Sequence, residues 1–242
     1  MKTIGIIGMG RMGQAIAALL ETRKDLIYHT FDRISTTHHD NLKSCDVVIE
    51  FTTPEAAPGV IRHCIEHGIR VTSGTTGWHE YHLESILTLC KQSKGTFLYA
   101  TNFSIGMNIV FALNRKLASV MDDFPAYKPA IKEIHHIHKK DSPSGTAYTL
   151  IEDILVRHKE YSGFVLNPEP GKIVNDRLPV TALREGEVKG FHEVTWNSGA
   201  ERISLAHEAF DRKIFAEGAV MSALWLMDQR PGIYTMQDII SI

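Results

Sequence analysis

The chain has 242 residues, a formal net charge of −2 with neutral histidines, 43% hydrophobic residues and 22% charged residues. This composition is typical of a globular protein with one large or two small domains, and the near-balanced charge argues against nucleic acid as a partner. The start of the chain, MKTIGIIGMG, has no apolar segment long enough for a signal peptide or a membrane span. We therefore expect a cytoplasmic protein without membrane contact, whose Cys45, Cys64 and Cys90 are buried thiols rather than disulfides.

A glycine loop follows the first predicted strand. Residues 2–7 form a short β-branched run, the sequence GMGRMG follows at once, and residues 14–22 have the periodicity of a helix. Strand, glycine loop and helix in this order are typical of a dinucleotide-binding site. The glycines let backbone N–H groups approach a pyrophosphate, whose charge the helix N-terminus stabilises. The predicted cofactor contacts are Gly8, Gly10, Arg11, Met12 and Gly13.

A second predicted strand, residues 26–31, leads to Asp32 and Arg33. An acid about 20 residues past the glycine loop accepts hydrogen bonds from the adenine ribose hydroxyls of NADH. An arginine in the same place attracts the 2′-phosphate of NADPH. The pair therefore predicts mixed or weakly biased use of NADH and NADPH. The alternative is a glycine turn in an α/β domain that binds no nucleotide.

Strands and helices continue to alternate over the first hundred residues. The strand at 46–51 is too continuously apolar to have a solvated face, which is typical of a parallel sheet covered on both sides. We then expect a helix with Pro54 in its first turn and Gly68 at its end, and further elements at 69–73, 79–93 and 96–100. The pattern predicts a Rossmann-like, doubly wound α/β domain with its ligand at the carboxyl ends of the strands.

The pattern changes after residue 104. A long amphipathic helix at about 105–121 precedes a strand at 130–137, and residues 172–210 have the pattern of antiparallel strands, with a turn at 197–199. These features predict a second domain of α+β class with a mixed or antiparallel sheet.

The last predicted helix, residues 213–227, is strongly apolar and is followed by a turn at 230–232. Such a helix needs a large apolar surface, and the sheet of the first domain is the obvious one. We therefore assign residues 1–104 and 213–242 to a dinucleotide-binding domain, and residues 105–212 to a substrate-binding and oligomerisation domain.

The segment EIHHIHKKDSPSGTA, residues 133–147, carries the most chemistry. Alternation along a strand would place His136 and His138 on one face and His135 on the other. Ser144 reads as the cap of a following helix, whose N-terminus beside a lysine forms a carboxylate-binding site. An imidazole that donates a proton near neutral pH, next to such a site, suits hydride addition to a C=N or C=C bond. The alternatives are a His-x-His metal site, which the adjacent lysines disfavour, and a solvated basic edge strand.

Together these segments resemble the 4-hydroxy-tetrahydrodipicolinate reductase (dihydrodipicolinate reductase) family over nearly the whole chain. The residues that carry the resemblance are Gly10 to Gly13, DVVIEF at 46–51 with Pro54 and Glu55, Gly74 to Gly77, Asn102 to Gly106, Glu133 to Ala147, and Phe215 to Leu226. The histidine-containing segment is the most specific of them.

The resemblance implies the role of each matching residue. His135 would be the general acid that protonates the substrate after hydride transfer, and Lys139 would hold a substrate carboxylate and assist. The other implied substrate-binding residues are His136, Ser144, Gly145, Thr146 and Thr76. The other implied cofactor-binding residues are Phe51, Thr52, Gly74, Thr75, Thr76, Asn102 and Phe103.

The resemblance also implies a reaction and an assembly. The reaction is the reduction of 4-hydroxy-tetrahydrodipicolinate, a small dicarboxylate, by NADH or NADPH in diaminopimelate and lysine biosynthesis, without a metal. The assembly is a homotetramer built on the antiparallel sheet. The alternatives are a dehydrogenase of another amino acid or imine, and a dinucleotide-sensing module without turnover.

Overall fold

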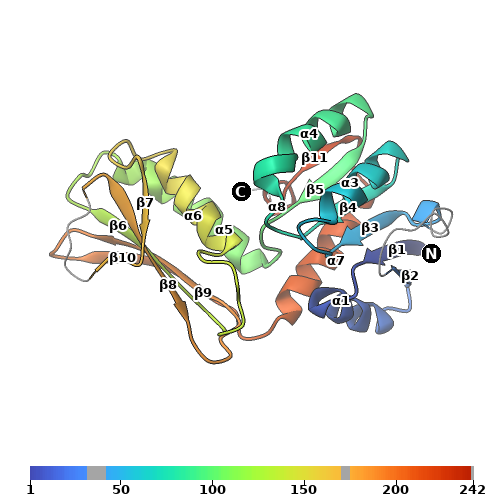
Figure 1. Cartoon of the computed structure of the whole chain (residues 1–242), viewed down its shortest axis with the longest axis horizontal. Helices are drawn as coiled ribbons and strands as arrows, with labels where there is room; N and C mark the ends of the chain where they lie inside the picture. The colour runs from blue at the N-terminus through green and yellow to red at the C-terminus, as the bar shows by residue number, and fades with distance from the viewer. Residues whose placement is uncertain (32–41, 170–174, 241–242) are drawn as a thin grey trace. The chain divides into compact units, whose positions relative to one another are not determined.

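The protein divides into two compact units, Met1–Ile105 with Lys213–Ile242, and Gly106–Arg212 (Figure 1). The computed structural model describes residues 1–31, 42–169 and 175–240. The chain passes between the units after residues 105 and 212, where the character of the sequence changes. Each unit has its own sheet and core.

The first unit is built on a six-stranded sheet in which every neighbouring pair is parallel. Its strands are β1 (Lys2–Ile7), β2 (Leu26–Phe31), β3 (Val47–Glu50), β4 (Arg70–Ser73), β5 (Thr96–Tyr99) and β11 (Gly232–Tyr234). Their order is β11-β5-β4-β3-β1-β2. The order reverses at β1, which has β2 on one side and β3 on the other. The carboxyl ends of β1 and β3 are therefore where a doubly wound sheet binds its ligand, and the Rossmann-like prediction is confirmed.

Helices cover both faces of this sheet (Figure 1). The helices are α1 (Arg11–Glu21) and α7 (Lys213–Met227) on one face, α3 (Ala57–Glu66) and α4 (His79–Gln92) on the other, and the short α8 (Met236–Ile240). Two separate apolar clusters result, one on each side of the sheet. Because both faces are buried, β3 has four fully buried residues and no solvated side, as its continuous apolar sequence predicts.

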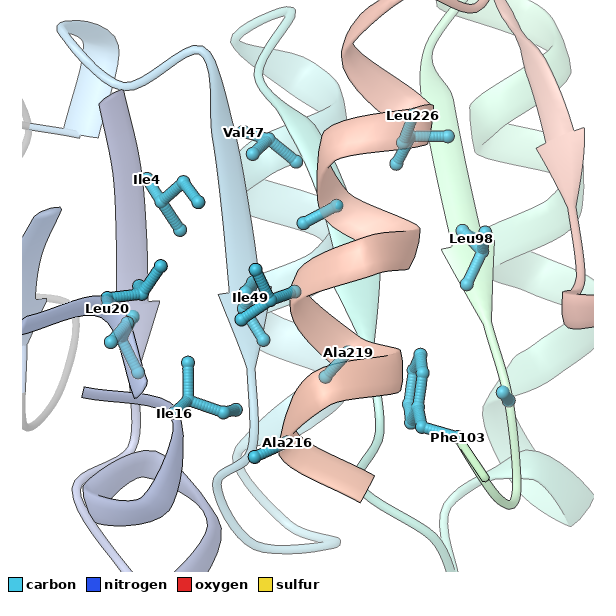
Figure 2. Packing of buried hydrophobic residues seen from close by; sticks show 14 of the residues in the cluster. Ile4, Ile16, Leu20, Val47, Ile49, Leu98, Phe103, Ala216, Ala219 and Leu226 are labelled. Atoms are coloured by element: carbon cyan, nitrogen blue, oxygen red, sulfur yellow. The ribbon is translucent and has the colours of Figure 1, made fainter. Parts of the chain in front are cut away.

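Helix α7 confirms the prediction for residues 213–227 in its bounds and its packing. Helix α7 packs against β3, β4, β5 and α1. Figure 2 shows Ala216, Ala219 and Leu226 of α7 facing Ile49, Val47 and Leu98 of the strands. A small residue lets the helix lie close to the loop after β5: a Cβ at Gly218 would be 1.9 Å from the carbonyl oxygen of Phe103.

The second unit has a five-stranded mixed sheet in the order β10-β9-β6-β8-β7. Its strands are β6 (Lys128–His135), β7 (Gly163–Leu166), β8 (Arg177–Arg184), β9 (Phe191–Asn197) and β10 (Arg202–Glu208), and its helices are α5 (Ile105–Met121) and α6 (Gly145–Leu155). The two helices and the sheet enclose one core, in which Trp196, Val180 and Leu150 are fully buried.

The structure corrects four expectations about local structure. Helix α3 begins at Ala57, with Pro58 and not Pro54 in its first turn. Gly232, predicted as the last residue of a turn at 230–232, instead begins the edge strand β11. Strand β8 pairs with β6 and β7 in parallel, so antiparallel pairing is confined to β6 with β9 and β9 with β10. The fourth correction concerns the end of β6.

Strand β6 ends at His135, two residues earlier than predicted. Its partner β8 ends at Arg184, and the chain turns at Glu185 and Gly186, whose φ is +45°. His136 and His138 therefore lie in a loop, and the prediction that they share one face of a strand is wrong. His135 and Glu133, by contrast, share the face that α6 covers.

All three cysteines are buried free thiols, as predicted. Burial raises the pKa of Cys64 to about 12, so this thiol is unreactive at neutral pH. Within the described parts of the chain, none of the helices has the length and apolar character required to cross a membrane.

Candidate active site

The glycine loop follows β1 and lies against the end of β3. Gly8 has a φ of +93°, and a Cβ there would be 2.1 Å from the carbonyl oxygen of Phe51. A Cβ at Gly13 would be 2.0 Å from the carbonyl oxygen of Gly8. Side chains are therefore excluded at both positions, because the loop turns tightly between β1 and α1.

The start of α1 is open to an anion. Gly10 is its N-cap, without a side-chain hydrogen bond, and the first turn contains no acidic residue. A Cβ at Gly10 would have no neighbour within 4 Å, and both Gly10 and Arg11 are exposed. The first N–H groups of α1 thus have no capping side chain, which is the arrangement that binds a pyrophosphate at a helix N-terminus.

Phe51 joins the three loops at this edge of the sheet. Its N–H donates to the carbonyl oxygen of Ile7 at the end of β1. Its ring lies 5.6 Å from that of Phe103, centroid to centroid. Its ring also fills the space beside Gly74, where a Cβ would be 2.2 Å from two ring carbons. Phe51, in the loop after β3, therefore connects the loops after β1, β4 and β5.

A fully buried carboxylate lies beneath these loops. Glu50, the last residue of β3, accepts hydrogen bonds from the Ser73 hydroxyl at 2.5 Å and from the Thr75 hydroxyl at 2.6 Å. It also accepts from the Thr52 N–H at 2.7 Å and the Thr52 hydroxyl at 2.6 Å. The Thr52 N–H lies 2.8 Å from the Thr75 hydroxyl oxygen as well. The predicted cofactor residues Thr52 and Thr75 therefore serve this internal network.

The other predicted residues of the first unit lie at or near the same edge. Thr76 is half-buried in the Gly74 to Gly77 turn, and Phe103 is 2% exposed. The side-chain oxygen of Asn102 accepts a hydrogen bond from the Ser104 N–H at 2.8 Å. Asp32 and Arg33 lie outside the described residues.

In the second unit, a buried cluster of polar groups surrounds Glu133, at the end of β6. The Glu133 carboxylate lies 3.5 Å from Nδ1 of His135 and 3.6 Å from Nε2 of His192 on β9. It accepts hydrogen bonds at 3.1 Å from the guanidinium of Arg184 on β8 and from the N–H of Ser144. Glu133 is fully buried, and His135 and His192 are 7% and 3% exposed.

Ser144 is the N-cap of α6, as predicted, and its polar groups point into the molecule. Its hydroxyl donates to Glu133 and accepts from the Ala147 N–H at 3.1 Å. The first turn of α6 contains no acidic residue, and Gly145 is half-buried. Because Glu133 fixes the position of Ser144, it also fixes the position of the next two residues, Gly145 and Thr146, at the start of α6.

Lys139 lies in the loop between β6 and α6. Its ammonium group is 2.9 Å from the carboxylate of Asp141, and its side chain is 23% exposed. Its carbonyl oxygen accepts from the Arg184 guanidinium at 3.3 Å. His136 is half-buried, and His138 is exposed beside Glu187 at 4.0 Å. The second unit thus places His135, Lys139 and the α6 N-terminus along one short stretch of chain.

The charges in this cluster are unequal. Burial alone would raise the pKa of Glu133, but hydrogen bonds from His192 and Ser144 and the nearby histidines lower it well below its usual value, so Glu133 is a carboxylate at neutral pH. Burial and then the neighbouring His192, Lys139 and Arg184 lower the pKa of His135, which Glu133 only partly offsets. His135 is therefore neutral at pH 7 in the protein alone.

Sequence reasoning missed four residues of these networks: Glu50, Glu133, Arg184 and His192. Only the two glutamates have a signal in the sequence: each is an acid in a predicted strand, next to residues of the predicted site. Glu133, His135 and His192 each bring a potential metal ligand atom within 4.8 Å of the others. The Glu133 carboxylate is already bound by a guanidinium and an N–H, so its charge is balanced without a cation.

A dinucleotide fits the edge of the first sheet. The glycine loop leaves out the side chains that would fill it, and the helix behind it presents unpaired N–H groups to a phosphate. In the same chain, the second unit holds a histidine, a lysine and a second helix N-terminus close together. The fold and these features define an oxidoreductase of the NAD(P)-dependent class.

Comparison with known proteins gives the family. The family description "Dihydrodipicolinate reductase, N-terminus" matches residues 2–103, and "Dihydrodipicolinate reductase, C-terminus" matches residues 106–240. The second match includes α7 and β11, which the structure assigns to the first unit. The chain belongs to the dihydrodipicolinate reductase family.

Relatives of full length support this assignment. A 4-hydroxy-tetrahydrodipicolinate reductase of Christiangramia forsetii is 41% identical over 98% of this chain and 97% of its own length. One of Rickettsia rickettsii is 36% identical over the full length of both chains. A dipicolinate-bound dihydrodipicolinate reductase structure from a Paenisporosarcina species has the same fold, with a TM-score of 0.73 at 22% identity over 99% of both chains.

Proposed function

We propose that this protein reduces 4-hydroxy-tetrahydrodipicolinate to tetrahydrodipicolinate with NADH or NADPH, with loss of water, in the diaminopimelate route to lysine. The observation that carries the proposal is the position of His135 and Lys139 directly before the N-terminus of α6, which Ser144 caps. Together with a dinucleotide fold and membership of the family, this arrangement suits a dicarboxylate that accepts a hydride and a proton.

The first unit is the proposed dinucleotide site. Gly8, Gly10, Arg11, Met12 and Gly13 would hold the pyrophosphate at the start of α1. Phe51, Thr52, Gly74, Thr75, Asn102 and Phe103 would form the cleft for the nicotinamide end, with Glu50 holding two of the loops from below. NADH or NADPH, when bound, supplies the hydride. Asp32 and Arg33 would bind the adenine ribose, and their opposed charges leave both cofactors usable.

The second unit is the proposed substrate site. A dicarboxylate needs two anion sites, and Lys139 with the α6 N-terminus provides two. The N–H groups of Gly145 and Thr146 are the donors proposed for one substrate carboxylate. Lys139 would leave its ion pair with Asp141 and bind the second substrate carboxylate. Because the N–H and hydroxyl of Ser144 bind Glu133, we propose that Ser144 supports this site by fixing the helix start. His136 and Thr76 stay predicted substrate contacts.

His135 is the proposed proton donor. In the protein alone its pKa is lowered, so it is neutral. A bound dianion would place negative charge close to His135 and raise that pKa, because an opposite charge favours the protonated imidazole. The proton would therefore be taken up with the substrate and then given to the ring that has received the hydride.

We also propose a homotetramer in the cytoplasm. The face of the second sheet opposite α5 and α6 has Ala130, Ile134 and Thr181 only half-buried, and Ile203 on the edge strand β10 is 37% exposed. An open edge strand with apolar side chains is an unfavourable surface for a monomer. Light scattering should give the mass of four chains. The mass of one chain would contradict this part of the proposal.

The reaction is tested with the purified protein and substrate made in place from pyruvate and aspartate semialdehyde by the preceding synthase. We expect oxidation of NADH or NADPH only when both synthase and protein are present. Cofactor binding without oxidation would favour a dinucleotide sensor, and oxidation with a different imine or amino acid would favour another dehydrogenase. The ratio of the two cofactor rates reports the combined effect of Asp32 and Arg33.

A further inference from the structure

We propose that Glu133 is a positioning residue that orients His135 and fixes the start of α6, so that one buried carboxylate aligns the proton donor with the carboxylate-binding N–H groups. This inference rests on the proposed function, in which His135 gives the proton. It adds a residue that does not itself contact substrate.

The register of the strands brings Glu133 and two histidines together. Glu133 and His135 are two residues apart on β6 and point to the same face. His192 on β9 is the direct cross-strand partner of Glu133. The three side chains therefore meet under α6, with the carboxylate 3.5 Å from Nδ1 of His135 and 3.6 Å from Nε2 of His192. The two imidazole rings lie edge to face, with centroids 5.0 Å apart.

Glu133 is also linked to the start of α6. The Ser144 N–H lies 3.1 Å from one carboxylate oxygen of Glu133 and 3.2 Å from the other, and the Ser144 hydroxyl donates to the second. The Arg184 guanidinium donates to the first oxygen and also to the carbonyl oxygens of Lys139 and Asp141. Glu133 thus joins β6, β8 and the loop before α6 through one group.

Glu133 also bears on the orientation of the His135 ring. Nδ1 of His135 is buried without a hydrogen bond to any residue that the structure describes, and lies 3.5 Å from the Glu133 carboxylate. The carboxylate charge favours the tautomer with hydrogen on Nδ1, because it would repel a lone pair on that nitrogen. The other nitrogen, Nε2, faces Gly190, where an added Cβ would be 3.4 Å away. Glycine at this position leaves the Nε2 side without a side chain. His135 would then give its proton from Nε2, and the Glu133 carboxylate beside Nδ1 would stabilise the positive charge of the protonated ring.

The charges facing His135 define what removal of Glu133 would do. Glu133 on β6 is its one negative neighbour among the groups that act on it, whereas His192 on β9, Arg184 on β8 and Lys139 in the loop oppose its protonation. His207 on β10 faces His192 across the next strand pair. Glu133→Gln would remove the negative charge and leave the positive ones. The pKa of His135 should then fall further, and the Nδ1–H tautomer should lose its preference.

The test uses nitrogen-15 NMR of the histidine side chains in the full protein, without and with dipicolinate as a dicarboxylate probe. In the wild type we expect the Nδ1–H tautomer of His135 at pH 7, and a pKa that is higher in the dipicolinate complex. In Glu133→Gln we expect loss of the tautomer preference and a fall in the complex pKa by about one unit or more. Glu193→Gln is the matched control, because Glu193 is the next residue on β9 and faces the other side of the sheet.

Kinetics provide the second readout. In Glu133→Gln, the decrease of kcat at high pH, which reports the pKa in the substrate complex, should begin at lower pH by the same shift, while the Kd for NADH stays within about threefold. Ser144→Ala keeps the Glu133 carboxylate, so it should keep the Nδ1–H tautomer of His135 and weaken substrate binding. If Glu133→Gln does not fold, Ser144→Ala is the second variant, and it tests the link between Glu133 and the start of α6. An unchanged tautomer and pKa in Glu133→Gln, or lost activity without a shifted pH profile, would overturn the proposal. If the wild type turns over no substrate, the proposed function fails, and the NMR result still decides whether Glu133 orients His135.

Discussion

The ring of Phe51 occupies the space that a side chain at position 74 would need, since a Cβ on Gly74 would be 2.2 Å from two of its ring carbons and 2.8 Å from one of Phe103. The loops after β3 and β4 are therefore interlocked at the carboxyl edge of the sheet. Only glycine at position 74 leaves room for the Phe51 ring. Phe51 can therefore lie beside the glycine loop.

Gly74→Ala should displace Phe51 and weaken cofactor binding. Overpacking of this kind costs about 1–3 kcal/mol, and we expect a lower melting temperature and an NADH Kd raised about tenfold. Fluorescence titration with NADH measures the second effect. Gly59→Ala is the control, because position 59 is exposed inside α3 and a Cβ there meets nothing within 4 Å. It should raise stability by about 0.5–1 kcal/mol and leave NADH binding unchanged. Equal NADH affinity in both variants would show that Phe51 does not shape the cofactor site.

Glu50→Ala should loosen the two loops that Glu50 joins. The substitution removes the Glu50 acceptor from the hydroxyls of Ser73 and Thr75, whereas the N–H of Thr52 keeps the Thr75 hydroxyl oxygen. Each buried donor left unpaired costs about 1–3 kcal/mol, so we expect a clear loss of stability in urea unfolding and weaker NADH binding. Glu55→Ala, five residues further on at an exposed position, should change neither. Unaltered NADH binding in a folded Glu50→Ala protein would contradict a role for this network in the cofactor site.

Lys139→Ala should mostly destroy turnover and leave NADH affinity within a few-fold. A hydrogen bond from an ammonium group to a carboxylate contributes about 1.5–3 kcal/mol, which corresponds to a kcat/KM lowered by about 10- to 100-fold. Steady-state rates and NADH titration separate the two effects. Lys140→Ala removes the same charge at the next, exposed position and should be nearly neutral. A matching loss of NADH binding in Lys139→Ala would contradict the assignment to the substrate.

Binding of a dicarboxylate should take up a proton at pH 7. Burial and positive neighbours lower the pKa of His135 in the protein alone, so the imidazole is neutral there, and a bound dianion raises that pKa. Calorimetry with dipicolinate in buffers of different ionisation enthalpy should give an uptake of about half to one proton per site. His135→Gln should abolish the uptake, whereas His138→Gln, at an exposed histidine, should retain it. No uptake in the wild type would mean that His135 does not gain its proton with the substrate.

Local patterns explain which parts of this structure the sequence predicts. The glycine loop and α7 were predictable because each is encoded by consecutive residues: glycines between a strand and a helix, and an apolar run of helical length. Strand β11 was not, because a strand of only three residues directly after Arg230-Pro231 has no local signal and forms by pairing with β5. The parallel direction of β8 likewise depends on its neighbours in the sheet.

The same reasoning applies to the site. His135, Lys139 and Ser144 lie in one segment, so their proximity can be inferred from the sequence. Their partners cannot, because His192 and Arg184 reach Glu133 only through the register of β9 and β8 against β6. The early end of β6 at His135 also follows from the end of β8. The residues that hold the proton donor are thus set by strand pairing between distant segments.

The most direct test of the proposed reaction follows the hydrogen atoms. NADH carrying deuterium at the transferred position of the nicotinamide is incubated with the protein and synthase-generated substrate in ordinary water, and the product is analysed by mass spectrometry and NMR. We expect one carbon-bound deuterium from the cofactor in tetrahydrodipicolinate, and the accompanying proton from solvent. Product without cofactor deuterium, or cofactor oxidation that does not depend on the substrate, would contradict it.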